Sequence, residues 1–88
     1  MTKQYRIYTQ RKNLKWMATM ISEYFGGFTV YKTAGHWNAK AEKSVVIEII
    51  TGDNQILAPR WILEIRKKIE AYNKQECVLI TKSEVEVL

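Results

Sequence analysis

Hydrophobic and polar positions alternate in two different periods along the chain. Apolar residues recur at i, i+3 and i+4 in two segments, which predicts helices over residues 14–25 and 59–73. The other apolar segments alternate or are rich in β-branched and aromatic residues, which is typical of strands. The four predicted strands cover residues 5–9, 28–33, 44–50 and 77–82.

The segments between these elements carry turn and cap residues. Asn13 is a favourable N-cap for the first helix, and Gly26-Gly27 is predicted to end that helix, since glycine adopts the left-handed conformation easily. The polar residues 38–43 predict a hairpin loop between the second and third strands. Residues 83–88 alternate again, and we expect them to extend the last strand or to add a short one.

The order of the elements is β-α-β-β-α-β. Two β-α-β halves with right-handed crossovers give a four-stranded antiparallel sheet with both helices on one face. The sequence therefore predicts the α+β class and a ferredoxin-like fold, with residues 1–88 as a single domain.

The alternation also predicts which side chains face away from the helices. The predicted core set is Phe28, Val30, Val45, Ile47 and Ile49. The opposite set is Tyr8, Tyr31, Val46, Glu48 and Ile50, with Val78 and Ile80 assigned to the same face. That face is too apolar to be left in water, so we expect a homodimer that packs sheet against sheet and encloses a cavity.

The first predicted helix is apolar over a wide arc. Trp16 and Met20 lie on its flank, where they either add cover over the sheet edge or contact another subunit. The predicted dimer interface comprises Tyr8, Tyr31, Val46, Ile50, Trp16 and Met20.

Composition and charge indicate the cellular compartment and limit the classes of partner. The 88 residues have a net charge of +5, but the basic residues fall into three separated groups, which is typical of a solvated surface. Cys77 is the only cysteine, so no internal disulfide forms; its place at the head of an apolar strand predicts a buried, inert thiol. The first ten residues lack the apolar run of a signal peptide, and no stretch is long enough for a membrane span. We expect a soluble, cytoplasmic protein without a membrane partner.

Residues for catalysis or metal binding are sparse. His36 is the only histidine, and no spacing places it near a nucleophile and an acid. One histidine and one cysteine do not make an ordinary zinc site, and no phosphate-binding glycine loop is present. We therefore predict no catalytic residue, no metal and no cofactor.

The most distinctive local feature is Gly35-His36-Trp37. Trp37 either packs over the end of the sheet or stacks on the ring of a ligand. Glu48 interrupts an apolar strand and needs a partner if a dimer buries it. The predicted ligand-binding residues are Tyr31, His36, Trp37, Glu48, Lys40 and Lys43.

Four short motifs in the C-terminal two-thirds agree in order and spacing. They are Gly27-Phe28-Thr29-Val30, Gly35-His36-Trp37, Glu42-Lys43-Ser44-Val45-Val46 and Gln75-Glu76-Cys77-Val78-Leu79. By these motifs the chain resembles a family of small, uncharacterised ferredoxin-like α+β domains. The resemblance implies the same fold but no reaction. It singles out six residues: Gly35, Trp37, Glu42, Ser44, Gln75 and Glu76.

These observations favour a non-enzymatic binding module. It would be a homodimer that binds a small anionic or nucleotide-like ligand, or a protein partner, through its sheet face and residues 35–37. One alternative is a viral or mobile-element inhibitor or adaptor that blocks a host defence complex or sequesters its nucleotide signal. Another is a cofactor-free enzyme of the dimeric α+β barrel type, which would use His36 or Glu48.

An RNA-binding module shares the same topology. Such modules stack bases on aromatic residues of their central strands. The predicted third strand, residues 44–50, contains neither an aromatic nor a basic residue, so the sequence argues against nucleic acid as a partner of the sheet.

Overall fold

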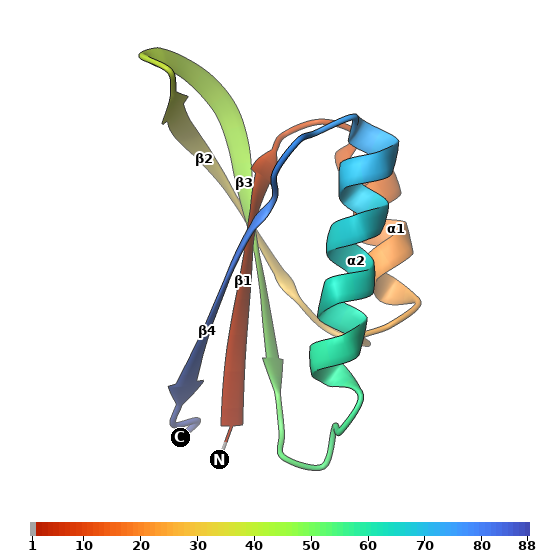
Figure 1. The fold of residues 1–88 in the computed structure, drawn as a ribbon. Helices are drawn as coiled ribbons and strands as arrows, with labels where there is room; N and C mark the ends of the chain where they lie inside the picture. The colour runs from red at the N-terminus through yellow and green to blue at the C-terminus, as the bar shows by residue number, and fades with distance from the viewer. Residues whose placement is uncertain (1) are drawn as a thin grey trace.

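Two helices cover one face of a four-stranded antiparallel sheet (Figure 1). The computed structural model describes residues 2–88. Its elements are β1 Thr2–Gln10, α1 Leu14–Ser22, β2 Thr29–Trp37, β3 Lys40–Thr51, α2 Ala58–Asn73 and β4 Leu79–Val85. The strand order β2-β3-β1-β4, with every neighbouring pair antiparallel, confirms the ferredoxin-like α+β fold.

The core lies between the sheet and the helices. The central strands β1 and β3 contribute the alternate residues Tyr5, Ile7, Val45, Ile47 and Ile49, all of them buried. The helices contribute Met17, Met20, Ile21, Ile62, Ile65 and Ile69. Phe28 and Val30, predicted for the core, are partly buried and pack against its margin, because β2 is an edge strand with one neighbour.

The other face of the sheet, which we call the open face, differs from the prediction at β4. Ile80 pairs with the buried Ile7, and Leu79 pairs with Tyr8. Since side chains alternate along a strand, Ile80 and Val78 lie on the helix side, and Leu79 lies on the open face with 58% of its surface exposed. The prediction that placed Val78 and Ile80 on the open face is therefore wrong by one residue of register.

The wide apolar arc of α1 is covered within the chain. Met20 is only 6% exposed and belongs to the core. Trp16 stacks on Tyr72 of α2, with ring centroids 3.8 Å apart and planes 7° apart. Met20 is therefore closed to a second subunit, whereas Trp16 is half-buried against Tyr72, which is itself 52% exposed.

The helix ends differ in part from the predicted ones. α1 ends at Ser22, three residues before the predicted end, although Phe25 is still buried. No glycine has a positive φ, so the prediction of a left-handed stop at Gly26-Gly27 is wrong. Asn13 occupies the N-cap position in the left-handed conformation without a side-chain cap bond, and its amide instead donates to Asn73 Oδ1 at 2.8 Å.

The β2–β3 hairpin is longer than predicted. Its strands pair as far as Trp37 and Lys40, so Asn38 and Ala39 alone form the loop. Both have positive φ, 50° and 62°, as a type I′ turn requires. The prediction of a loop over residues 38–43 is wrong because the polar residues after Ala39 continue the strand.

Replacing Ala39 by glycine should raise the stability of the protein. A residue with a Cβ is strained at φ 62°, whereas glycine is not. We expect Ala39→Gly to increase the free energy of unfolding by about 0.5–1 kcal/mol, measured by urea denaturation. Ala34→Gly, in the strand of the same hairpin and without a positive φ, is the matched control and should lower stability; a gain for both variants would refute the turn assignment.

Candidate functional site: a pocket beneath the β2–β3 hairpin

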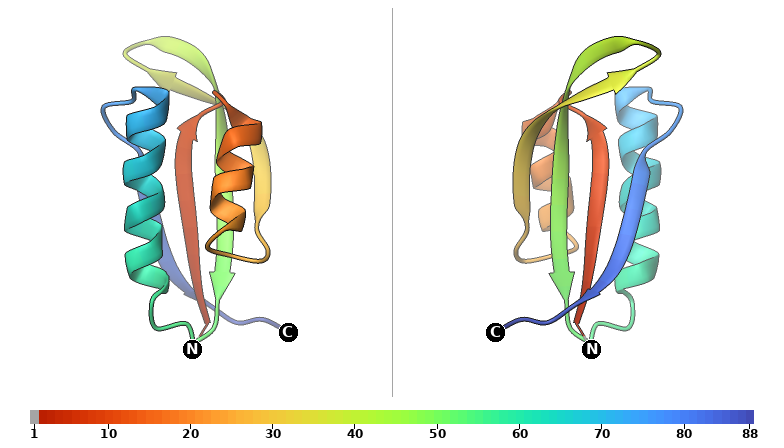
Figure 2. Two further views of the ribbon diagram at one scale, coloured as in Figure 1. Left: turned by 90° about the vertical axis from the view of Figure 1, so that its right-hand side faces the viewer. Right: turned by 90° about the vertical axis from the view of Figure 1, so that its left-hand side faces the viewer.

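The upper part of the β2–β3 hairpin extends past the rest of the sheet. Pairing of β1 with β3 ends at Gln10 and Ser44, and beyond that pair residues 34–43 form a two-stranded ladder with no third strand beside it. This two-stranded part, which we call the arch, curves over the end of the sheet toward the connection between α2 and β4 (Figure 2, right). The arch, the sheet and the connection enclose a pocket between them.

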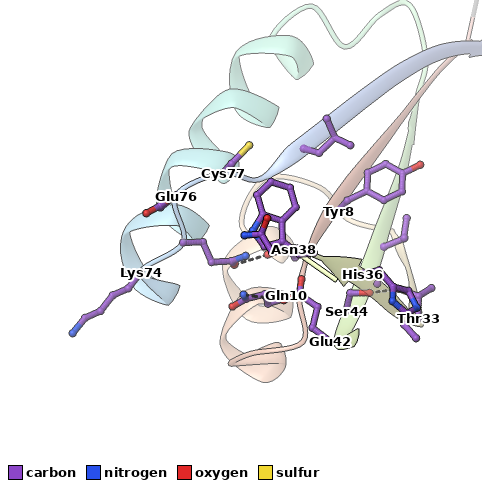
Figure 3. Close-up of a pocket in the computed structure, with 17 residues that line it drawn as sticks. Tyr8, Gln10, Thr33, His36, Asn38, Glu42, Ser44, Lys74, Glu76 and Cys77 are labelled. Atoms are coloured by element: carbon purple, nitrogen blue, oxygen red, sulfur yellow. Dashed lines mark hydrogen bonds between the residues drawn. The ribbon is translucent and has the colours of Figure 1, made fainter. Parts of the chain in front are cut away.

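This hairpin pocket has a volume of about 860 Å³, within the range of small-molecule sites. The sheet supplies Tyr8, Gln10, Ser44, Val46 and Leu79 to its lining. The hairpin supplies Thr33, Gly35, His36, Trp37, Asn38 and Glu42, and the α2–β4 connection supplies Lys74, Gln75, Glu76 and Cys77 (Figure 3).

Short polar contacts fix the hairpin side of the pocket. The hydroxyls of Thr33 and Ser44 share a hydrogen bond of 2.8 Å across the two strands, and Gln10 Nε2 donates to Glu42 Oε2 at 3.3 Å (Figure 3). A Cβ on Gly35 would lie 3.3 Å from Ser44 Oγ, a tight contact. Glycine at this position therefore leaves room beside the hydroxyl pair.

Arg11 holds the base of the arch from outside the pocket. Its Nη2 donates to the carbonyl of Thr33 at 3.0 Å, and its Nε to the carbonyl of Ser44 at 3.4 Å. Its backbone N–H donates to the carbonyl of Lys43 at 3.0 Å. One residue of the β1–α1 connection thus bonds both strands where they leave the sheet.

Hydrogen bonds to β1 and to the β1–α1 connection fix the position of the α2–β4 connection. Asn73, 1% exposed, donates to the carbonyl of Lys12 at 3.0 Å and accepts the bond from Asn13. Lys74 then turns the chain in the left-handed conformation, with φ 54°. Thr9 Oγ1 donates to Gln75 Oε1 at 2.6 Å, which ties this wall of the pocket to β1.

Two of the predicted ligand-binding residues border the pocket. His36 and Trp37 line it, and Trp37 is 67% exposed. Tyr31 lies lower on the open face, opposite Val46 on β3. Lys40 pairs with Trp37 at the tip, and Lys43 lies on the helix side; neither lines the pocket.

Glu48 lies outside the pocket and has a partner. Its Oε2 accepts a bond from Arg6 Nε at 3.1 Å on the open face. The carboxylate of Glu48 raises the pKa of Arg6, chiefly through this hydrogen bond. Glu48 and His36 are therefore not brought together within one chain.

Sequence patterns missed part of the lining. Tyr8 was assigned to the predicted dimer interface, while Gln10, Thr33, Lys74 and Cys77 were assigned no ligand contact. Gln10 enters the site only because its pairing with Ser44 puts it beside Glu42. The strand register was the one signal that would have identified it.

Cys77 is exposed, so the prediction of a buried thiol is wrong. β4 begins at Leu79, two residues later than predicted, and Cys77 belongs to the connection that borders the pocket. Maleimide should therefore label Cys77 in the native protein at a rate close to that in urea, followed by mass spectrometry. Labelling only after unfolding would show that the thiol is shielded.

The charges that line the pocket are mixed. Glu42 and Glu76 provide two carboxylates, and Lys74 provides one ammonium group. Among residues 2–88, no three or more His, Cys, Asp or Glu side chains gather as a metal site would require. None of the helices in this part of the chain is long and apolar enough to cross a membrane.

Comparisons with known proteins show what the fold resembles. No protein-family model and no curated protein matches the chain. Several solved structures do. A DUF3240 family protein from Shewanella baltica matches with a TM-score of 0.66 and 13% identity over 99% of this chain and 92% of its own.

Two further structures are described as nitrogen regulatory or nucleotide complexes. CPII, a nitrogen regulatory PII-like protein from Thiomonas intermedia bound to ADP, AMP and bicarbonate, matches with a TM-score of 0.66 and 9% identity over 98% of this chain and 91% of its own. The B. subtilis GlnK–ATP complex matches with a TM-score of 0.62 and 12% identity over 93% and 81%. At these identities the likeness shows a shared fold.

Proposed function

We propose that the protein is a non-enzymatic binding module that holds a small nucleotide-like ligand in the hairpin pocket. One observation carries this proposal. The resemblance to small uncharacterised domains singles out six residues, and every one of them lines the pocket. They are Gly35, Trp37, Glu42, Ser44, Gln75 and Glu76, and they come from two hairpin strands and a distant connection. Strand pairing brings the four hairpin residues together, and the Thr9–Gln75 bond brings the connection beside them.

The lining suits a ring that carries hydrogen-bonding groups. Trp37 offers an exposed indole on which a base can stack. Glu42 and Gln10 place a carboxylate and an amide on the adjacent wall, where they would meet the polar edge of that base. Lys74 is the one lysine of the lining, so a phosphate would lie at the connection.

Adenine nucleotides are the first ligands to test. Of the two similar structures, CPII holds ADP and AMP and GlnK holds ATP, and this chain shares their fold. Because the lining has two carboxylates and one lysine, we expect the ring rather than a chain of phosphates to dominate affinity.

Isothermal titration calorimetry with adenosine, AMP, ADP and ATP tests the proposal. We expect saturable binding, with affinities for adenosine and AMP within about tenfold of each other, which corresponds to about 1.4 kcal/mol. Glu42→Gln should weaken binding, whereas Glu64→Gln, a matched change on α2, should not. Absence of binding by all four compounds, or equal loss in both variants, would count against a nucleotide site.

We also propose that two copies pack through their open faces. Three apolar side chains are exposed on this face, an unusually large apolar area for a surface in water: Tyr31 by 47%, Ile50 by 48% and Leu79 by 58%. A two-fold arrangement would bring the Arg6–Glu48 pair of each chain toward that of its partner, where opposite charges can bond across the interface. A second copy there would also cover the side of the pocket that Tyr8 and Val46 line.

Light scattering on the purified protein tests the dimer. Wild type should have twice the 10.4 kDa mass of one chain, and Tyr31→Lys with Ile50→Lys should have the monomer mass. Leu63→Lys, at a site 47% exposed on α2, is the control and should leave the dimer intact. A monomeric wild type at micromolar concentration would refute the arrangement.

The structure provides less support for an enzyme. The barrel-type alternative would use His36 or Glu48; Glu48 is paired with Arg6 outside the pocket, and His36 lines the pocket without Glu48 beside it. The inhibitor, adaptor and RNA-binding alternatives stay predictions from the sequence.

A further inference from the structure

The basic residues that looked dispersed along the sequence gather at one end of the fold. Residues 10–15, 32–44 and 70–77 all lie at the end that carries the arch (Figure 1). They contain seven of the fourteen lysines and arginines but three of the nine acidic residues. The rest of the chain, with seven basic and six acidic residues, is nearly neutral. The excess positive charge is thus a local property.

At this end the charge is also divided between two sides. Glu42 and Glu76 line the pocket together with one lysine, Lys74. Lys32 pairs with the buried Val45, and Lys43 lies two residues before Val45 on β3, so both belong to the helix side of the hairpin. Glu42 is the only acidic residue among residues 32–44, and it lies on the other side, opposite Gly35.

The β1–α1 connection and the first turn of α1 add three more cations at this end of the fold. Arg11 bonds the carbonyls of Thr33 and Ser44, which places it against the hairpin. Lys12 reaches the carbonyl of Asn73 at 3.1 Å, and Lys15 is an exposed residue of the first turn of α1. We call Arg11, Lys12, Lys15, Lys32 and Lys43 the basic surface.

Three of these cations have no counter-charge. Within residues 2–88, the ammonium groups of Lys15, Lys32 and Lys43 form no ion pair or hydrogen bond. Elsewhere in residues 2–88, Lys3, Arg6 and Arg60 each pair with a glutamate, and Lys67 and Lys82 form no ion pair. A cluster of unneutralised lysines on an exposed ridge is the arrangement that binds a polyanion.

We propose that the basic surface binds the phosphate backbone of duplex DNA, independently of the hairpin pocket. The arch is a two-stranded β-ribbon that projects from the body of the protein, and a B-DNA major groove admits such a ribbon. Lysine and arginine side chains on its helix side then meet the phosphates that flank the groove. The sequence argued against RNA because the predicted third strand, residues 44–50, lacks aromatic residues on which bases could stack. A contact between the basic surface and phosphates lies on the other side of the sheet and needs no stacking.

The chemistry of the surface favours nucleic acid over a lipid headgroup layer. Proteins that bind a membrane surface insert large apolar side chains into the lipid beside their lysines. On the helix side of the arch, the small residues Ala34 and Ala41 are the apolar ones. Trp37 lies on the other side, with Gly35 and Glu42.

Fluorescence anisotropy with a labelled duplex of about 20 base pairs tests the proposal, in a series of salt concentrations. Contacts from the three free lysines predict a slope of log affinity against log salt of about −2.7, or about a 40-fold loss between about 50 and 200 mM. Lys32→Gln with Lys43→Gln should weaken binding at least tenfold at the lower salt and reduce the slope to about −0.9.

A double variant with the same net charge provides the control. Lys67→Gln with Lys82→Gln removes two exposed lysines away from the arch and should retain the slope. Equal losses in both variants would show that net charge alone attracts the duplex, and would overturn the proposal. So would a wild type that does not bind at low salt, or one that binds anionic vesicles more tightly than DNA with the same dependence on Lys32 and Lys43.

Discussion

Replacing Trp37 by alanine is expected to weaken the binding of adenine nucleotides by about 5- to 150-fold. Stacking of a base on an aromatic side chain contributes about 1–3 kcal/mol, and Trp37 is the most exposed aromatic residue of the pocket lining. Because 67% of its surface is already in water, its loss should leave the melting temperature almost unchanged. Calorimetry measures the affinity and circular dichroism the stability.

Fluorescence gives this variant an internal control. Trp16 stacks on Tyr72 and Trp61 packs edge-on against Phe25, so a ligand in the pocket should alter the emission of Trp37 alone. The ligand-dependent change should vanish in Trp37→Ala and persist in Leu63→Ala, an exposed apolar truncation on α2. If Trp37→Ala binds as tightly as wild type, the ring does not stack there.

Replacing Asn73 by alanine is expected to lower the free energy of unfolding by about 2–4 kcal/mol. Asn73 is fully buried, and its amide joins the β1–α1 connection to the end of α2. Truncation removes three hydrogen bonds, to the carbonyl of Lys12, the amide of Asn13 and the sulfur of Met17, and the net contribution of each bond is about 0.5–1.5 kcal/mol. Urea denaturation measures the effect.

Two substitutions separate the buried network from a general effect of losing an asparagine. Asn54→Ala, in the exposed turn after β3, should change stability by less than about 0.5 kcal/mol. Asn73→Asp keeps the shape but loses the donor to Lys12 and buries a carboxylate, so it should also be strongly destabilising. A small effect for Asn73→Ala would mean that water replaces the lost bonds.

Periodicity predicted the six elements and their order because it reports burial, which is what arranges these strands and helices. The 0% exposure of Val45 and Ile49 follows from alternation along β3. The hairpin was predicted, but its two-residue turn was not, because Asn38-Ala39 lacks the glycine that usually marks such a turn. Lys40 and Lys43 resembled loop residues because they lie on a part of the strand that no helix covers.

The candidate site was predictable where it depends on local sequence and unpredictable where it depends on register. Gly35 and Trp37 stood out as neighbours in a short motif. Gln10 and Lys74 reach the same cavity only through the pairing of β1 with β3 and the bend after α2. The clustering of basic residues at one end of the fold was not predicted for the same reason, since Lys15 and Lys43 are far apart along the chain.

The arch has a consequence for how a ligand enters. Its residue pairs beyond Gln10 and Ser44 have no third strand beside them, so opening them breaks few contacts. Amide hydrogens there should exchange with solvent through local fraying, while those of Ile7 and Ile47 should exchange only when the whole protein unfolds. The arch can therefore open and close over the pocket while the core stays folded, and we expect a bound molecule to slow this motion.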